Sequence, residues 1–195
     1  MKRRIILASA SPRRINMLRT AGYELTVVPA EIDESKFILD DPIATVSKLA
    51  FEKALSVKES LLSSQRNVLN QNECIIAADT IVYFDEIIGK PEDKEDALKI
   101  LMKLSGQMHK VYTGVAILST REDKHKVFTD ETSVYFKTYS PEELEEYLNS
   151  PEPYDKAGAY AIQGYFGKYI HHIEGDYDNV MGLPLSKLLE ELQNF

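Results

Sequence analysis

The hydrophobic positions of this chain follow two periods, which predicts a protein that contains both strands and helices. Short apolar runs predict strands over residues 4–8, 23–30, 74–84, 110–118 and 126–136. Apolar residues spaced three and four apart predict helices over residues 12–21, 42–60, 92–106, 141–149 and 184–193. Since strands and helices alternate and neither dominates, the pattern predicts an α/β fold with a mixed sheet.

Capping signals mark the ends of several of these helices. Ser11 is a candidate N-cap, Pro12 suits the first helical position, and Gly22 suits the residue that stops the helix. Ser140 and Glu143 form a capping box before the fourth helix. These signals place the helix boundaries independently of the hydrophobic pattern.

The second predicted helix carries a charged residue on its apolar face. Ile43, Val46, Ala50 and Val57 form its predicted core face, and Lys53 falls on the same stripe. A lysine in that position must either extend its ammonium to water or find a partner. The extended side chain is the commoner outcome, so Lys53 by itself is a modest candidate for function.

Two other segments carry weaker patterns. Residues 61–73 are polar and lack alternation, which favours a linker, and residues 157–175 are rich in Gly and Tyr, which we interpret as short paired strands. The chain shows no internal repeat. We therefore expect one domain that spans residues 1–195.

Composition narrows the function classes. The net charge of −8 disfavours general binding to nucleic acid or to an anionic membrane, although the basic residues near the N-terminus leave a local anion site open. No apolar run approaches the length of a membrane span. The single cysteine, Cys74, cannot form an intramolecular disulfide. We expect a cytoplasmic protein without nucleic-acid or membrane partners.

The stretch "SASPRR" is the first candidate for chemistry. A helix N-terminus offers free backbone N–H groups that bind phosphate. Ser9 and Ser11 add hydroxyl donors, and Arg13 and Arg14 add planar donor pairs. The alternative is an ordinary capped helix with two solvated arginines, and the residues alone leave both open.

The stretch "AADTIV" is the second candidate. Asp79 lies among apolar strand residues, where a carboxylate is costly to bury unless it is paired, hydrogen-bonded or bound to a metal. Ligands of open α/β sheets bind at the C-terminal ends of strands. An aspartate that only turns the chain is the alternative, and we favour the functional interpretation.

Three single residues are weaker candidates for a functional role. Lys90 lies in the loop motif "GKP", Glu34 in the acidic segment "EIDES" and Gln163 in "AIQG". They suit a phosphate contact, a Mg²⁺ ligand and a contact to a base edge, but a single residue of each type is more often part of a solvated loop. The four histidines show no metal-binding spacing, and no serine-hydrolase elbow occurs.

Seven segments in order resemble the Maf family of nucleotide pyrophosphatases, a family once linked to inhibition of septum formation. They are "LASASPRR", "LAFEKA", "AADTIV", "GKP", "LSGQMHKVYTGV", "DKAGAYAIQG" and "GDYDNVMGLP". The resemblance implies an elongated, two-lobed fold similar to that of Maf and HAM1 proteins, with a twisted mixed sheet and a cleft between the lobes. It also implies hydrolysis of a nucleoside triphosphate to the monophosphate and pyrophosphate, with Mg²⁺ or Mn²⁺ as cofactor.

The resemblance assigns roles to individual positions. It implies phosphate binding at Ser9, Arg13 and Arg14, a metal-associated acid at Glu34, functional lysines at Lys53 and Lys90, and a proton acceptor at Asp79. In the mechanism that these roles suggest, we expect Asp79 to share the metal ion with Glu34. The subgroup that acts on dTTP and UTP is similar to this chain at Arg13, Thr80 and Gln163. A homodimer is also plausible by resemblance.

Three other functions stay open at this level. The chain could be a non-catalytic regulator of division that senses a nucleotide, a nucleic-acid-binding protein, or an inosine-type triphosphatase. The full set of charged candidates argues against the first, the net charge of −8 against the second, and "AADTIV" with "AIQG" against the third. Whether canonical or modified nucleotides are the substrate in the cell is not encoded in any motif.

Overall fold

A computed structural model describes residues 4–63 and 73–195, and it confirms the mixed α/β class. The described residues form seven strands, β1 (Arg4–Leu7), β2 (Leu25–Val27), β3 (Glu73–Phe84), β4 (Glu86–Ile88), β5 (Met108–Ser119), β6 (His125–Phe136) and β7 (Ile170–Glu174). They form one sheet in the order β2-β1-β3-β5-β6-β7, with β4 paired to β3. The sheet is mixed because β1 runs parallel to β2 and β3, whereas β4 and β7 pair antiparallel to β3 and β6.

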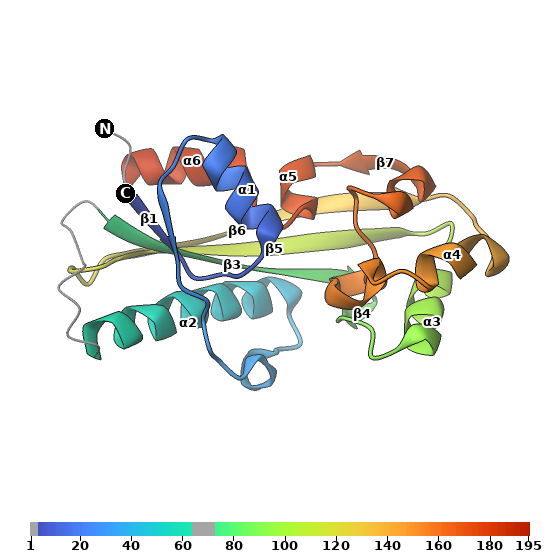
Figure 1. Ribbon diagram of the computed structural model, residues 1–195, viewed down its shortest axis with the longest axis horizontal. Helices are drawn as coiled ribbons and strands as arrows, with labels where there is room; N and C mark the ends of the chain where they lie inside the picture. The colour runs from blue at the N-terminus through green and yellow to red at the C-terminus, as the bar shows by residue number, and fades with distance from the viewer. Residues whose placement is uncertain (1–3, 64–72) are drawn as a thin grey trace. The chain divides into compact units, whose positions relative to one another are not determined.

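Helices lie between most consecutive strands, whereas β3 and β4, and likewise β5 and β6, follow each other without a helix (Figure 1). The α-helices are α1 (Pro12–Thr20), α2 (Pro42–Ser63), α3 (Lys94–Leu104), α4 (Glu145–Leu148), α5 (Tyr177–Val180) and α6 (Leu185–Asn194). The 3₁₀ helices are η1 (Glu34–Phe37), η2 (Glu142–Leu144), η3 (Glu152–Asp155), η4 (Ala157–Ala159) and η5 (Tyr165–Tyr169). No helix in the described part of the chain is both long and apolar enough to cross a membrane.

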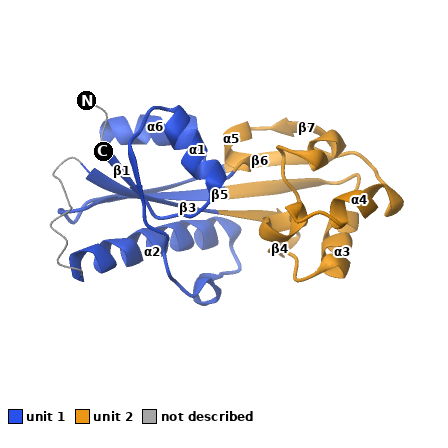
Figure 2. Ribbon diagram, in the orientation of Figure 1, with its two compact units in different colours: residues 1–79, 113–130, 182–195 blue, residues 80–112, 131–181 orange. Residues whose placement is uncertain are grey.

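The chain divides into two compact units (Figure 2). Unit 1 takes residues 1–79, 113–130 and 182–195, and unit 2 takes residues 80–112 and 131–181. The strands β3, β5 and β6 each contribute residues to both units. The expectation of a single domain and that of a cleft between lobes stay predictions.

In unit 1, α2 covers one face of the sheet, and α1 and α6 lie on the other face (Figure 1). Its core joins residues of β1, α2, β3 and β5, among them Ile6, Ala50 and Ile75. Gly114 of β5 packs directly on α2, because a Cβ atom at this position would lie 2.3 Å from the carbonyl oxygen of Val46. This close approach fixes the height of α2 above the sheet.

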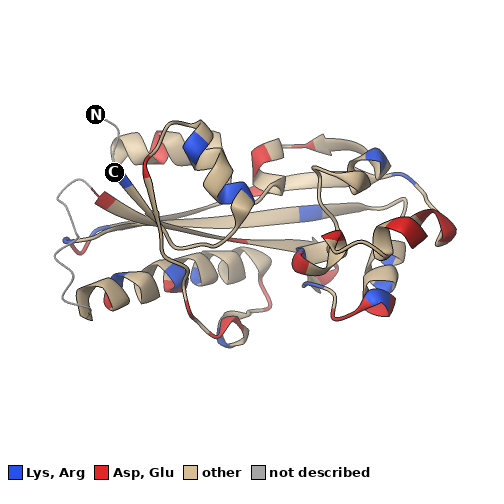
Figure 3. Cartoon of the chain, in the orientation of Figure 1, with Lys and Arg blue, Asp and Glu red and all other residues tan. Residues whose placement is uncertain are grey.

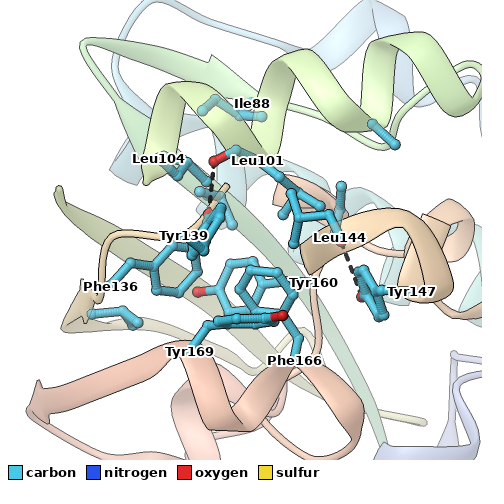
Figure 4. Packing of buried hydrophobic residues seen from close by; sticks show 14 of the residues in the cluster. Ile88, Leu101, Leu104, Phe136, Tyr139, Leu144, Tyr147, Tyr160, Phe166 and Tyr169 are labelled. Carbon is cyan, nitrogen blue, oxygen red and sulfur yellow. Dashed lines mark hydrogen bonds between the residues drawn. The ribbon is translucent and has the colours of Figure 1, made fainter. Parts of the chain in front are cut away.

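Unit 2 is built around a cluster of aromatic side chains (Figure 4). Phe136, Tyr139, Tyr160 and Phe166 pack with ring centroids 4.8–6.1 Å apart. Such tilted and edge-on pairs are the favoured geometries of aromatic rings. The Tyr139 hydroxyl donates to the Leu101 carbonyl over 2.6 Å, which satisfies a polar atom inside this apolar cluster.

Most of the predicted elements are confirmed, with shifted ends. The helix predicted over 42–60 continues to residue 63, so the first three residues of the predicted linker are helical, and residues 64–72 lie outside the described residues. The capping box before α4 is half formed, because the backbone N–H of Ser140 donates to Glu143 Oε2 over 2.9 Å. The short elements β4 and α5 were not predicted.

Three expectations were wrong. Residues 157–175 form η4, η5 and a single strand, because Gly158 and Gly164 take positive φ angles of 72° and 130° that interrupt strand pairing. Ile43 is 43% exposed and does not belong to the core face of α2. Ser11 occupies the N-cap position of α1, but its side chain makes no capping hydrogen bond.

Candidate functional site

The ammonium of Lys53 lies between two carboxylates of unit 1. Its Nζ atom is 2.6 Å from Asp79 Oδ1 and 2.8 Å from Glu34 Oε1. The side chains of Lys53 and Asp79 are only 13% and 11% exposed, whereas that of Glu34 is 56% exposed. Residues 34, 53 and 79, predicted from separate segments, therefore meet in one charged cluster that opens to solvent at Glu34.

The pair of Lys53 and Asp79 explains why a lysine lies on the apolar stripe of α2. Ala50 and Val57 of α2 are buried in the core of unit 1, and Lys53 lies between them along the helix. Asp79 is the last residue of unit 1 on β3 and follows a run of fully buried apolar residues. The lysine thus compensates a carboxylate that would otherwise be buried without a partner, which is the costly case.

Arg14 of α1 connects three segments of unit 1. Its Nε atom donates to the Gly182 carbonyl and its Nη1 atom to the Ala78 carbonyl, each over 2.7 Å. Nη1 also lies 3.3 Å from Ser9 Oγ. Burial lowers the pKa of Arg14, and the nearby carboxylate of Asp79 acts in the opposite direction.

The two serines of the predicted anion site differ in their contacts. Ser9 lies between β1 and α1, and its Oγ atom accepts from the backbone N–H of Ser11 over 3.2 Å. Ser11 is half-buried at the start of α1. The first turn of α1 contains no acidic residue, so no carboxylate within that turn offsets the positive end of the helix dipole, which favours anions.

Basic residues are spread along α1 (Figure 3). Arg13 is half-buried, and its guanidinium makes no hydrogen bond or ion pair with residues 4–63 or 73–195. Arg14, by contrast, is bonded to main-chain oxygens. The two adjacent arginines therefore have different environments, and Arg13 is the one whose donors are available to a bound anion.

The remaining predicted site residues belong to unit 2. Thr80 follows Asp79 on β3 and is half-buried, whereas Lys90 lies in the loop after β4 and is exposed. Gln163 is exposed in the loop between η4 and η5. Their contribution to the same site stays a prediction.

The described residues contain no group of three or more histidine, cysteine or acidic side chains that could hold a metal ion. Glu34 and Asp79 nevertheless place two carboxylate oxygens against one ammonium. Mg²⁺ is commonly bound by one or two carboxylates together with substrate phosphates. The donor set fits an ion that binds jointly with a phosphate and does not fit a closed protein cage.

Sequence reasoning missed the acceptors that hold Arg14. Ala78 and Gly182 contribute their main-chain carbonyls, and no side-chain type marks such a role. The φ angle of Gly182 is 106°, which favours glycine, so the glycine in "NVMGLP" was the one available signal.

Comparison with known proteins identifies relatives of this chain and its family. Two curated relatives, one from Bacillus anthracis and one from Bacillus cereus, are each named dTTP/UTP pyrophosphatase. Each is 42% identical over 194 residues, which cover 99% of this chain and 96% of the relative. Among solved structures, the Staphylococcus aureus Ham1 protein aligns with 96% of this chain and 99% of its own at 17% identity and a TM-score of 0.45. Residues 4–195 match the family described as Maf-like protein, and the chain belongs to that Maf family.

Proposed function

We propose that this protein is a nucleoside triphosphate pyrophosphatase that hydrolyses dTTP and UTP to the monophosphate and pyrophosphate. The observation that carries the proposal is the buried contact between Lys53 and Asp79, with Glu34 on the same ammonium. A buried carboxylate held in this way, next to the main-chain carbonyl that binds Arg14 of α1, suits hydrolysis of a phosphoanhydride, and curated relatives at 42% identity have that named activity.

The proposed chemical step uses Asp79 as the proton acceptor. A water molecule attacks the α-phosphorus and forms a new P–O bond, the bond from this phosphorus to the bridging oxygen breaks, and pyrophosphate leaves with the bonding electrons. The proton of the water passes to the Asp79 carboxylate. Lys53 orients that carboxylate through the contact to Oδ1, so the acceptor is in place before the substrate arrives.

Binding of the triphosphate falls to cationic and N–H donors. Arg13 has donors available for phosphate oxygens, and the first turn of α1 adds backbone N–H groups. We assign Lys90 a contact to the same triphosphate as a point charge. Arg14 contributes indirectly, because its guanidinium holds the main chain at Ala78 and Gly182.

A divalent cation, Mg²⁺ or Mn²⁺, is part of the proposal. Glu34 and Asp79 would hold it together with phosphate oxygens. When bound, such an ion neutralises phosphate charge and makes a water ligand more acidic. Lys53 touches both carboxylates, so its ammonium offsets their negative charge when no cation is bound.

Base selection is assigned to unit 2. Thr80 and Gln163 carry groups that both donate and accept hydrogen bonds, as the edge of a thymine or uracil requires. Their match to the dTTP and UTP subgroup supports this assignment.

We also place the reaction in the cytoplasm, with nucleotides and no nucleic acid as partners, on the basis of the net charge of −8 and the single cysteine. A homodimer stays a prediction.

The test is a panel of nucleoside triphosphates at fixed Mg²⁺, with separate measurement of monophosphate, pyrophosphate and orthophosphate. We expect pyrophosphate and monophosphate in equal amounts, fastest from dTTP and UTP. In ¹⁸O-labelled water, the label should enter the monophosphate. Preference for a purine would contradict the substrate assignment, and label in pyrophosphate would contradict attack at the α-phosphorus.

The same panel tests the cation and the alternative of a nucleotide-sensing regulator. Removal of divalent ions with a chelator should abolish turnover, and added Mg²⁺ or Mn²⁺ should restore it. Turnover that persists in the chelator would contradict the cation role. Binding of dTTP without any pyrophosphate release would favour the regulator.

A further inference from the structure

Unit 2 contains a buried polar pair that the proposed chemistry does not use. His109 Nε2 of β5 lies 2.8 Å from the Tyr160 hydroxyl oxygen, and the two residues are 1% and 5% exposed. The ring of His109 also packs edge-on against Phe136, with centroids 4.5 Å apart. The pair therefore lies inside the aromatic cluster of unit 2.

This pair has an energetic cost. His109 Nδ1 is buried and has no hydrogen-bond partner among residues 4–63 and 73–195. Burial lowers the pKa of His109 to about 3, so the ring is neutral and carries a single N–H at neutral pH. Whichever nitrogen holds that proton, Nδ1 is left unsatisfied, which two apolar side chains in the same place would avoid. The hydrogen bond between His109 and Tyr160 fixes the orientation of the Tyr160 side chain, which apolar packing alone would not do.

The segment that Tyr160 belongs to is held in an unusual conformation. Gly158 and Ala159 have φ angles of 72° and 57°, so a fully buried alanine adopts the left-handed region that L-residues disfavour. The Ala159 carbonyl accepts from the Tyr147 hydroxyl over 3.0 Å. The N–H of Gly158 donates to the Gly89 carbonyl, also over 3.0 Å. Together with the contact to His109, these bonds hold three consecutive residues.

This anchored turn leads directly to the residue assigned to the base. Tyr160 and Ala161 are buried, and Gln163 follows two residues later in an exposed loop. A rotation of the chain at residue 160 would therefore displace the amide of Gln163. Hydrogen bonds weaken steeply once they are misaligned, so a small displacement is enough to weaken base reading.

We infer that His109 is a positioning residue for base selection, which acts through its hydrogen bond to Tyr160 by fixing the loop that presents Gln163. The inference rests on the proposed function, because it concerns how the same site distinguishes a thymine or uracil from other bases. His109 does not touch the nucleotide in this account. Its effect is on the preference among substrates.

The measurement is the ratio of kcat/KM for dTTP to that for dCTP. Partial unfolding or loss of active enzyme lowers both values equally and leaves the ratio unchanged, so the ratio reports positioning alone. Tyr160→Phe removes one oxygen atom and keeps the ring. We expect it to lower the ratio by about tenfold, the factor that one ordinary hydrogen bond supplies.

Tyr139→Phe is the matched control. Tyr139 is 4% exposed, lies in the same aromatic cluster, and donates to the Leu101 carbonyl instead of to the turn. We expect it to lower the melting temperature and to leave the ratio unchanged. An unchanged ratio in Tyr160→Phe, or an equal fall in both variants, would overturn the inference.

Two further variants keep the test decisive if Tyr160→Phe does not fold. His109→Gln offers an amide near the position of Nε2 and should retain most of the preference, whereas His109→Phe should lose it. Equal ratios in these two variants would overturn the inference. In a Gln163→Ala background, His109→Phe should cause no additional change, because the amide that it positions is absent.

A different result would contradict the proposed function itself. A wild-type protein with no preference for dTTP over dCTP would contradict the substrate assignment before any variant is compared. A wild-type preference that survives in Tyr160→Phe would leave the proposed function intact and remove only the role of His109.

Discussion

Arg14 Nη1 lies 2.7 Å from the carbonyl oxygen of Ala78, the residue that precedes Asp79 in β3. The guanidinium therefore holds the main chain next to the proposed proton acceptor. Its Nε atom binds the Gly182 carbonyl at the same time. We therefore propose that Arg14 positions Asp79, whereas its neighbour Arg13 has donors available for phosphate.

This division of roles predicts the kinetics of Arg14→Lys. A lysine keeps the charge but cannot reach two carbonyls with a planar pair of donors. We expect kcat for dTTP to fall by about 10²-fold, the loss associated with a misplacement of about 1 Å, with little change in KM. Arg19→Lys on the exposed face of the same helix is the control and should behave as wild type.

The opposite kinetic pattern would assign Arg14 a different role. If Arg14→Lys raised KM and left kcat unchanged, the guanidinium would bind phosphate directly in the ground state and the positioning role would be wrong.

A second prediction concerns Asp79→Asn. The amide oxygen can still accept from Lys53, so the fold of unit 1 should survive, but the amide cannot take up a proton from water. We expect kcat for dTTP to fall by about 10²–10⁴-fold. Pyrophosphate release measures the loss, and circular dichroism checks the fold.

Asp130→Asn is the matched control for this variant. Asp130 also pairs with a lysine of unit 1, with Oδ1 3.1 Å from Lys187 Nζ, and it belongs to none of the segments with a proposed role. Because Asp130 has no proposed contact with the substrate, the turnover of this variant should stay within about twofold of wild type, a change that corresponds to less than about 0.5 kcal/mol. Near-normal turnover of Asp79→Asn would discard Asp79 as the proton acceptor.

The sequence marked Lys53 and Asp79 as candidates for a physical reason, but it did not predict that the two residues pair with each other. A lysine on the apolar stripe of α2 and an aspartate in an apolar strand each require a partner, and in the fold they are partners of each other. Glu34 was a weaker prediction because an acidic loop is ordinarily solvated, and it too contacts Lys53.

The contacts of Arg14 and the turn at Ala159 could not be predicted in the same way. Main-chain carbonyls are present at every residue, so no residue type indicates that Ala78 and Gly182 accept from a guanidinium. The Gly- and Tyr-rich segment depends on tertiary packing, because its φ angles and its anchor to His109 arise only when β5 is adjacent. Local pattern and propensity do not contain that information.

A third prediction tests the packing of α2 on β5. In Gly114→Ala, the new Cβ atom would lie 2.3 Å from the Val46 carbonyl oxygen and 2.9 Å from the Ser47 nitrogen, both main-chain atoms that cannot rotate away. We expect a loss of about 1–3 kcal/mol in the free energy of unfolding. Turnover should also fall, since α2 carries Lys53.

Gly89→Ala provides the comparison for stability. A Cβ atom at residue 89 meets nothing within 4 Å, so its free energy of unfolding should stay within about 0.5 kcal/mol of wild type. Equal stability of the two variants, measured by urea denaturation, would show that α2 moves away from Gly114 without cost.

The buried ring of His109 makes stability depend on pH. Burial lowers the pKa of His109 to about 3 in the folded protein, against an ordinary value of 6.5. Below pH 6.5 the unfolded chain therefore binds a proton that the folded chain does not, and the free energy of unfolding falls as the pH falls. The stability that neutral His109 allows is fully present above pH 6.5 and is lost progressively down to about pH 3.

The expected slope for this single group approaches about 1.4 kcal/mol per pH unit once the pH is well below 6.5. Urea denaturation between pH 7 and pH 5, followed by circular dichroism, measures it. His109→Gln removes the titrating group and should flatten the curve by this amount relative to wild type. If the curves of wild type and His109→Gln run parallel, protonation of His109 does not oppose folding, and the ring must reach water or an acid partner in the folded protein.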